Sequence, residues 1–308
     1  MMEIARRFKL FSGKPDAPGG FTLIELLVAM TIASVVGIAI LTNFISQQRA
    51  ATIVREVAQM QQQLRGATYI IEHDFRLTGY NPEKRDAFGV MDVKRDSVEK
   101  ATWGGAVNTF FTTAYDWSFG NPATNGNGLR DEPRFTYGLF DLTGNGVTDL
   151  VRVEDIDLPN RQLAHVQLVA ENIEAMGFAF AYSAGGGNLA RDAGNNIIWA
   201  VDTNNDNMLD SRLDGIGGTT ALGENIPRES IRMARIWLLA RARSDSPGYI
   251  NTERYVLSDQ VIDYAKIFEE TGTADRFRRR LLERTIEFFN MGLQALQTAT
   301  DASIRSLA

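Results

Sequence analysis

The hydrophobic positions of this chain fall into two regimes, and the first is a continuous apolar stretch near the N-terminus. Between Phe21 and Ile45 nearly every residue is apolar, and Glu25 is the one charged residue before Gln48. At about 25 residues this stretch is long enough to cross a lipid bilayer as a single α-helix.

Helical spacing continues beyond the apolar stretch. The segment 47–78 contains no Pro and a single Gly, and its apolar residues recur three or four positions apart. These residues are Ile53, Val57, Met60, Leu64, Ala67, Ile70, Ile71 and Phe75. The pattern predicts one helix from about Phe21 to about Leu77, roughly 80 Å long at 1.5 Å per residue. Its first half is apolar all round, its second half is amphipathic, and the breakers from Gly79 to Pro82 end it.

The second regime consists of short β-type runs separated by loops rich in Asn, Gly and Asp. Because these runs do not alternate with helices, they favour an antiparallel over a parallel sheet. We therefore expect an α+β fold, with one long helix laid on an antiparallel sheet that carries long loops. Segment 168–175 reads as a short helix or a strand entry. The expected strands are 134–140, 150–154, 165–169, 175–182, 232–243, 253–262 and 284–289, and the expected loops are 118–132, 141–149, 183–198 and 202–230.

Charge and cysteine content indicate where the protein lies in the cell and which partners it suits. The 308-residue chain has a net charge of −6, yet the leader before the apolar stretch is net basic. A basic segment before a membrane helix orients the N-terminus to the cytoplasm, so the rest of the chain is expected on the outer side, in a periplasm or its equivalent. An acidic domain is a poor general partner for nucleic acid. Because the chain has no Cys, an exported head cannot be stabilised by disulfides and needs a large core or another cross-link.

The junction between leader and apolar stretch differs from an ordinary secretory signal. Secretory signals are cut after the apolar region, which is thereby lost. Here the small residues Gly19 and Gly20 stand before that region. Cutting after Gly20 would remove the leader and retain the membrane helix, and the alternative is an uncleaved signal anchor.

This junction, Gly20-Phe21-Thr22-Leu23-Ile24-Glu25-Leu26, resembles the class III signal of type IV pilins and pseudopilins. Gly20, Phe21 and Glu25 match the family pattern. The resemblance implies cleavage between Gly20 and Phe21 by a prepilin peptidase, N-methylation of Phe21, and assembly with other minor and major pilins through the N-terminal helix. It also implies a pilin-like fold, in an inner-membrane protein with one span whose head lies in the periplasm and later in a pilus at the cell surface.

The carboxylate of Glu25 has two possible roles. A charge in the hydrocarbon region is costly and is by default a functional hypothesis. The resemblance implies that the N-terminal amine of a neighbouring subunit neutralises Glu25 during assembly. The alternative is that Glu25 caps its own helix, whose dipole favours an anion in the first turn.

Two further segments resemble PilW-type minor pilins. Residues 74–80 look like the D-x-R-x-A-G-Y pattern of that group, with Thr78 in place of the usual Ala. Residues 277–290 resemble its ending in part, with Phe289 where Arg is usual. The resemblance implies a minor pilin that acts in filament initiation, in assembly or at the tip. The alternatives are a J-type minor pseudopilin of a type II secretion system and a calcium-dependent adhesin head on a pilin stem.

The resemblance and the patterns together divide the chain into four parts. Residues 1–20 form a cleaved leader, and 21–78 form the pilin helix with its transmembrane part at 21–45. Residues 79–290 form a β-rich head in the periplasm or outside the cell. Residues 291–308 form a tail, either a marginal helix or disordered.

Two loops have the spacing of calcium ligands. Segment 202–210 places oxygen atoms at positions 1, 3, 5, 7 and 9 of an EF-hand-type loop, although Leu213 stands where the bidentate Glu is expected. Its candidate ligands are Asp202, Asn204, Asp206, the Met208 carbonyl and Asp210. The second loop offers Asp141, Thr143, Asn145 and Asp149. A third, 125–132, is weaker, and all three compositions also suit ordinary turns.

No catalytic constellation accompanies these loops. The chain has two His residues, His73 and His165, and neither lies in a recognisable catalytic motif. Cys nucleophiles, phosphate-binding loops and serine-hydrolase elbows are absent from the sequence. We therefore expect a structural subunit and no enzyme. The basic run Arg276 to Arg280 reads either as a contact patch or as a solvated strand entry.

Overall fold

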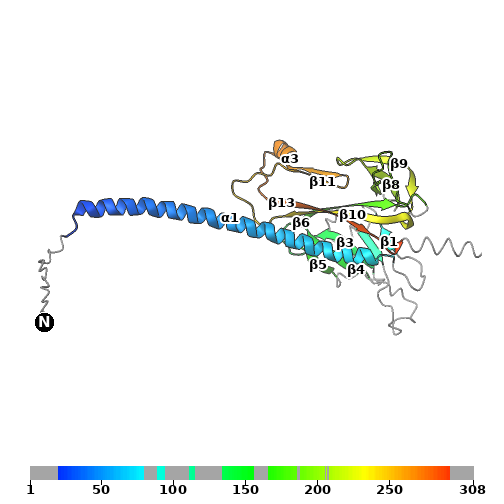
Figure 1. The fold of residues 1–308 in the computed structure, drawn as a ribbon, viewed down its shortest axis with the longest axis horizontal. Coiled ribbons are helices and arrows are strands. Elements are labelled where there is room, and N and C mark those ends of the chain that lie inside the picture. Colours follow the sequence, from blue (N-terminus) through cyan, green and yellow to red (C-terminus); the bar gives the residue numbers. More distant parts are fainter. Residues whose placement is uncertain are drawn as a thin grey trace, which may run out of the picture. The chain divides into compact units, whose positions relative to one another are not determined.

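The chain divides into two compact units, Met1–Ile53 and Val54–Ala308, and the boundary falls inside the long helix α1 (Figure 1). The second unit is called the head below. The computed structural model describes residues 20–79, 89–93, 111–114, 134–155, 166–185, 188–204, 206 and 208–291.

Helix α1 spans Leu23–Leu77, 55 residues, which confirms the helix predicted from the apolar spacing. Among the described residues, α1 is the helix long and apolar enough to cross a membrane. Its apolar side chains up to Ile45 are exposed, as expected of a surface that meets lipid or other helices. From Met60 onward its apolar stripe is buried in the core of the head, through the side chains of Met60, Leu64, Ala67, Ile71 and Phe75.

The head contains two antiparallel sheets and a separate hairpin. The five-stranded sheet has the order β1-β2-β3-β4-β5. Its strands are β1 (Gly89–Asp92), β2 (Phe111–Ala114), β3 (Arg134–Phe140), β4 (Asp149–Asp155) and β5 (Val166–Ala170). The six-stranded sheet has the order β13-β10-β6-β7-β8-β9. Its strands are β6 (Ile173–Tyr182), β7 (Ala200–Val201), β8 (Leu209–Leu213), β9 (Thr219–Ile226), β10 (Ile231–Arg241) and β13 (Arg279–Glu287). This arrangement confirms the predicted class, a long N-terminal apolar helix with a head of antiparallel sheets.

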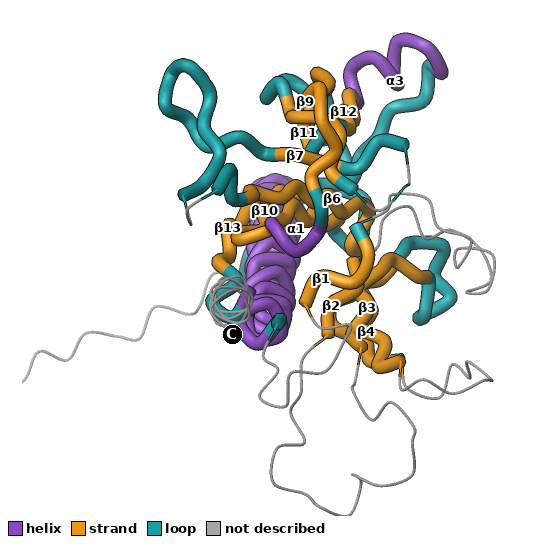
Figure 2. Tube along the Cα trace, turned by 90° about the vertical axis from the view of Figure 1, so that its right-hand side faces the viewer, coloured by secondary structure: helices purple, strands orange, loops and turns teal. Residues whose placement is uncertain are grey.

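Strand β10 sits between β6 and β13 and separates two cores. Its alternation sends Ala234, Ile236 and Leu238 into the core shared with α1, and sends Trp237 and Leu239 into a second core on the opposite face. Three shorter elements follow β10. They are β11 (Arg254–Leu257), β12 (Gln260–Asp263) and helix α3 (Tyr264–Thr271), and a 3-10 turn at Arg228–Ser230 precedes β10. In both ribbon and tube views β11 and α3 lie on the side of the six-stranded sheet away from α1 (Figures 1 and 2).

Two expected elements were wrong. The run 253–262, expected as one strand, is the β11–β12 hairpin, which turns at Ser258 with a positive φ of 58°. The segment 202–230, expected as a loop, holds β8 and β9, because β9 is an exposed polar strand that apolar alternation does not reveal. Strand β13 also begins five residues before the predicted run, since Arg279 already pairs with Arg241 of β10.

The remaining predicted strands are confirmed to within a few residues at their ends. Segment 168–175 holds the end of β5, a tight turn at 171–172 where Asn172 has a positive φ of 57°, and the start of β6, so the helix alternative is wrong and the strand entry is confirmed. The expected loop 118–132, His165 and nearly all of the tail lie outside the described residues.

Candidate functional site

The predicted processing junction lies just before α1. Gly20 and Phe21 precede the first helical residue, Leu23, and the Phe21 side chain is 89% exposed. No atom lies within 4 Å of the position where a Cβ on Gly20 would stand. The leader residues 1–19 lie outside the described residues. The bond between Gly20 and Phe21 is therefore outside the helix and accessible.

Glu25 closes a capping box at the start of α1. Thr22 donates its backbone N–H and its hydroxyl to Glu25 Oε2, both at 2.9 Å. In return, the backbone N–H of Glu25 donates to Thr22 Oγ1 at 3.3 Å. This reciprocal pattern satisfies free donors at a helix start. Glu25 Oε1 has no hydrogen bond to any residue that the structure describes, so the carboxylate keeps an acceptor for a second partner.

At the other end of α1, a buried charged cluster joins the helix to the five-stranded sheet. The Asp74 side chain is 2% exposed, and its Oδ2 lies 2.6 Å from Arg152 Nε on β4. The Tyr137 hydroxyl of β3 donates to the same oxygen. Burial, together with the nearby Asp74 charge, raises the pKa of Tyr137 well above its usual value. The second oxygen of Asp74, Oδ1, lies 3.3 Å from Nδ1 of His73, so His73 contacts its neighbour on the same helix.

Aromatic packing surrounds this cluster. Phe75 meets Tyr137 edge to face with ring centroids 6.2 Å apart, and it lies 5.4 Å from the ring of Phe288. The Arg152 guanidinium lies 3.7 Å above the centre of the Phe135 ring. The charged pair is thus enclosed by apolar surface, where loss of one partner is far more costly than in water.

The chain segment after β13 caps the C-terminus of α1. Asn290 Nδ2 donates to the carbonyls of Arg76, at 2.9 Å, and Leu77, at 3.3 Å. Gly79 has a positive φ of 82° and lies against Met291. The structure therefore brings the end of segment 277–290, at Phe288 and Asn290, against the described residues of segment 74–80, which is far away in the sequence. Sequence reasoning missed Tyr137 and Arg152, since nothing in their local pattern marks them as partners of Asp74.

In the candidate loop 141–149 the carboxylates bind backbone N–H groups. Asp149 is fully buried. It accepts from the N–H of Leu142 at 3.2 Å and Thr143 at 3.0 Å through Oδ2, and from the N–H of Asn172 at 2.9 Å through Oδ1. These contacts tie the loop to the turn between β5 and β6.

Asp141 and Asn145 hold the tip of the same loop. Asp141 accepts from the N–H of Asn145 at 3.1 Å and from that of Gly146 at 2.9 Å. Asn145 Oδ1 accepts from the N–H of Val147 at 2.8 Å. Such Asx-type bonds are typical of ordinary turns, the alternative interpretation of this loop.

The candidate loop 202–210 is organised in the same way. Asp210 accepts from the N–H of Thr203 and Asn204, and Asp206 accepts from the N–H of Met208 at 2.9 Å. Asp202 is 1% exposed, whereas Asp206 is exposed. Within the described part of the chain, no group of three or more His, Cys, Asp or Glu side chains is placed to hold a metal ion. Calcium binding by either loop stays a prediction.

Comparison with known proteins bears on the N-terminal junction. Residues 18–41 match the family model described as the prokaryotic N-terminal methylation motif, which includes Gly20, Phe21 and Glu25. No curated protein matches the chain. Among solved structures, a type IV-like pilin from Thermus thermophilus is similar at 13% identity and a TM-score of 0.38, over 76% of this chain and 98% of that chain. A likeness at that level carries no argument about this protein.

Proposed function

We infer that this chain is a type IV pilin-like subunit, a structural component whose head is carried on a membrane-anchoring helix. The observation that carries this inference is the methylation motif at 18–41, which runs without a break into the 55-residue helix α1. A motif of this kind places the small residues before the apolar stretch, so processing would leave the anchor in place. The amphipathic second half of α1, buried in the head, fits the same role.

A prepilin peptidase is the enzyme expected to process the chain. It would cut between Gly20 and Phe21 and leave N-methylated Phe21 as the first residue. Both residues are exposed and precede the helix, which supports access by a membrane peptidase. The basic leader would stay on the cytoplasmic side of the inner membrane, with the acidic head in the periplasm before assembly.

Assembly with other minor and major pilins would use the apolar half of α1. Its exposed side chains offer van der Waals contact to neighbouring helices inside the membrane. The free Oε1 of Glu25 supports a bond to the N-terminal amine of an adjacent subunit while Oε2 still caps the helix. The two readings of Glu25 are therefore compatible in one molecule.

Within this family we propose a PilW-type minor pilin that acts in filament initiation or at the tip. The support is the convergence of segments 74–80 and 277–290 on one end of α1, where Asn290 caps the helix. A head with two sheets and a hairpin would also obstruct close packing along a shaft, which favours a tip position. Co-purified pilus subunits would support this assignment, and co-purified secretion subunits would instead indicate the J-type pseudopilin.

The test is the mature N-terminus of the membrane-bound protein. The full chain is expressed with a prepilin peptidase, and the N-terminal peptide is identified by mass spectrometry. We expect singly methylated Phe21 in the parent, and an uncut leader in Gly20→Val, whose added side chain meets open space and so affects recognition alone. Gly19→Val is the matched control and should be processed. A parent protein that retains Arg6, or that starts after Ile45, would overturn the proposal.

A further inference from the structure

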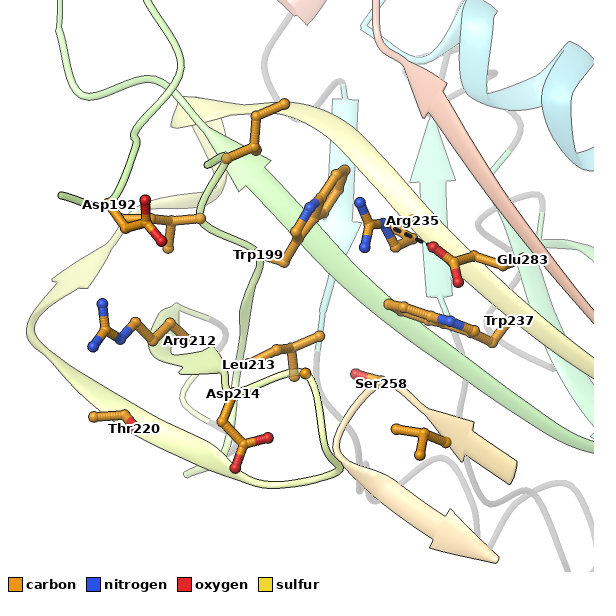
Figure 3. A pocket seen from close by; sticks show the side chains of 14 residues that line it. Asp192, Trp199, Arg212, Leu213, Asp214, Thr220, Arg235, Trp237, Ser258 and Glu283 are labelled. Carbon is orange, nitrogen blue, oxygen red and sulfur yellow. Dashed lines mark ion pairs between the residues drawn. The ribbon is translucent and has the colours of Figure 1, made fainter. Parts of the chain in front are cut away.

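A cavity of about 500 Å³ lies on the face of the six-stranded sheet that α1 does not cover (Figure 3). Its walls come from β10, β13, β8, β9, the hairpin strand β11 and the segment before β7. This volume is in the range of cavities that hold small ligands, roughly 300–1,000 Å³. Every residue that lines it belongs to the head. We call this cavity the sheet-face groove.

The strand register explains how charged and aromatic side chains meet in the sheet-face groove. Alternation along β10 places Arg235 and Trp237 on the same face, and Glu283 of β13 stands opposite Trp237. The hairpin forms one wall because the Ser258 hydroxyl donates to the Phe178 carbonyl at 2.7 Å. Gly177 permits this close approach, since a Cβ there would lie 3.1 Å from the backbone of the hairpin.

Two arginines bring side-chain hydrogen-bond donors that have no acceptor among the described residues. The guanidinium carbon of Arg235 lies 4.1 Å from the centre of the Trp199 ring, and its Nε lies 3.4 Å from Glu283 Oε1. Within the described residues, the terminal nitrogens of Arg235 make no hydrogen bond. The side chain of Arg212 makes neither a hydrogen bond nor an ion pair with any residue that the structure describes. Figure 3 shows Arg212 and Arg235 on opposite sides of the groove.

Acceptors are also available. Asp214 Oδ1 accepts from the N–H of Ile216 at 2.9 Å and that of Gly218 at 2.8 Å, while Asp214 Oδ2 has no hydrogen bond among the described residues. The Glu283 side chain is 51% exposed, so solvent or a ligand reaches it. The carboxylate of Asp192, in contrast, is occupied by the backbone and side-chain N–H groups of Asn196.

The donors, acceptors and aromatic rings of the sheet-face groove together indicate which kind of ligand it fits. Hydroxyl groups donate and accept at once, so a polyhydroxylated molecule can use free guanidinium donors and free carboxylate acceptors together. The lining carries three carboxylates and two arginines, which disfavours a strongly anionic or strongly cationic ligand. The two indole rings, Trp199 and Trp237, supply apolar surface for the C–H face of a sugar ring.

We propose that the sheet-face groove is a binding site for a neutral saccharide. Arg212 and Arg235 donate to ring hydroxyls, Asp214 Oδ2 accepts from them, and the indole rings contact the apolar face of the sugar. The site is on the head and does not depend on how the subunit is processed or assembled. Its occupancy can therefore be tested without a filament.

The test measures sugar binding by the full chain, held in a zwitterionic detergent because alkyl-glycoside detergents present a sugar of their own. A glycan array covering neutral oligosaccharides of glucose, galactose, mannose, xylose and N-acetylglucosamine selects the tightest sugar. Titration of that sugar against tryptophan fluorescence then gives Kd. Glucuronate, inorganic phosphate and an acidic peptide are titrated in parallel to identify an anion site.

We expect saturable binding of at least one neutral sugar. Arg212→Gln and Asp214→Asn should each weaken it at least tenfold, because each removes a group that bonds the sugar hydroxyls. In Asp214→Asn the amide oxygen can still accept from the N–H groups of the turn, while an NH2 group replaces the Oδ2 acceptor. The matched control is Arg280→Gln, an exposed arginine that pairs with Ala240 on the opposite face of the same sheet, and its Kd should equal that of the parent. Circular dichroism melting establishes that the variants fold. Absence of binding across the whole array would overturn the proposal. So would an anion that binds in preference to every neutral sugar, or a Kd that Arg280→Gln changes as much as Arg212→Gln.

Discussion

We expect the buried pair of Asp74 and Arg152 to be sensitive to a single substitution. Their side chains are 2% and 15% exposed, and Asp74 Oδ2 lies 2.6 Å from Arg152 Nε. Asp74→Asn removes the negative charge at constant volume, so the buried Arg152 guanidinium loses the carboxylate beside it. Breaking a buried ion pair in this way costs about 3–5 kcal/mol of unfolding free energy. For a domain of this size that corresponds to a fall in Tm of about 6 °C or more, at about 2–4 °C per kcal/mol.

The matched control lies two residues away on the same helix. Glu72 pairs with Arg76 and Arg284, whose side chains are 56% and 52% exposed, so Glu72→Gln should cost under about 1 kcal/mol because solvent screens both pairs. A second variant, Asp74→Leu with Arg152→Met, removes both charges and is made in a Tyr137→Phe background, because the buried Tyr137 hydroxyl would otherwise lose its acceptor on Asp74. Because replacing a whole buried pair by apolar groups is often near neutral, this double variant should recover most of the stability that Asp74→Asn loses in the same background.

The assay is urea unfolding of the full chain in detergent, followed by circular dichroism and tryptophan fluorescence. Coincidence of the two curves tests whether the head unfolds as a unit. The reasoning is refuted if Asp74→Asn costs no more than Glu72→Gln. It is also refuted if the double variant is no more stable than the single one, since the cost would then come from lost packing and not from an uncompensated charge.

Three further predictions concern other parts of the chain. Glu25→Ala should leave membrane insertion intact, since removing a charge eases partitioning, but should reduce co-purification with partner pilins; unchanged association would leave helix capping as its one role. Calcium should raise the Tm of the chain, and chelator should reverse the rise. At a hundredfold excess over Kd the free energy of unfolding should increase by about 2.7 kcal/mol, and Asp202→Ala with Asp206→Ala should remove most of that response. If the double variant responds like the parent, segment 202–210 is only a turn. Because the pKa of Tyr137 is raised in the folded state, its contribution to stability is complete below about pH 10 and is lost as the pH rises above that value. Tyr137→Phe should therefore unfold in urea with a weaker dependence on alkaline pH, and an unchanged dependence would contradict the linkage.

Local signals in the sequence determined the parts of this protein that depend on near neighbours along the chain. An apolar run bounded by Gly20 and interrupted by Glu25 predicts both the methylation motif and the helix start. The three-and-four spacing from Ile53 to Phe75 predicts the helix and its buried face, because periodicity alone decides which side chains share a face. Short β-type runs predicted β3, β6 and β10 in the same local way.

Tertiary structure alone decided which distant residues meet. Asp74 lies 78 positions before Arg152, and Glu283 follows Arg235 by 48 positions, so neither pairing leaves a trace in local spacing. The polar strand β9 forms because β8 offers it hydrogen-bond partners, and the second core exists because Gly177 lets a hairpin approach the sheet. Local propensity fixes the elements, whereas strand register and close packing fix their partners, since only those bring together atoms that the chain itself keeps far apart.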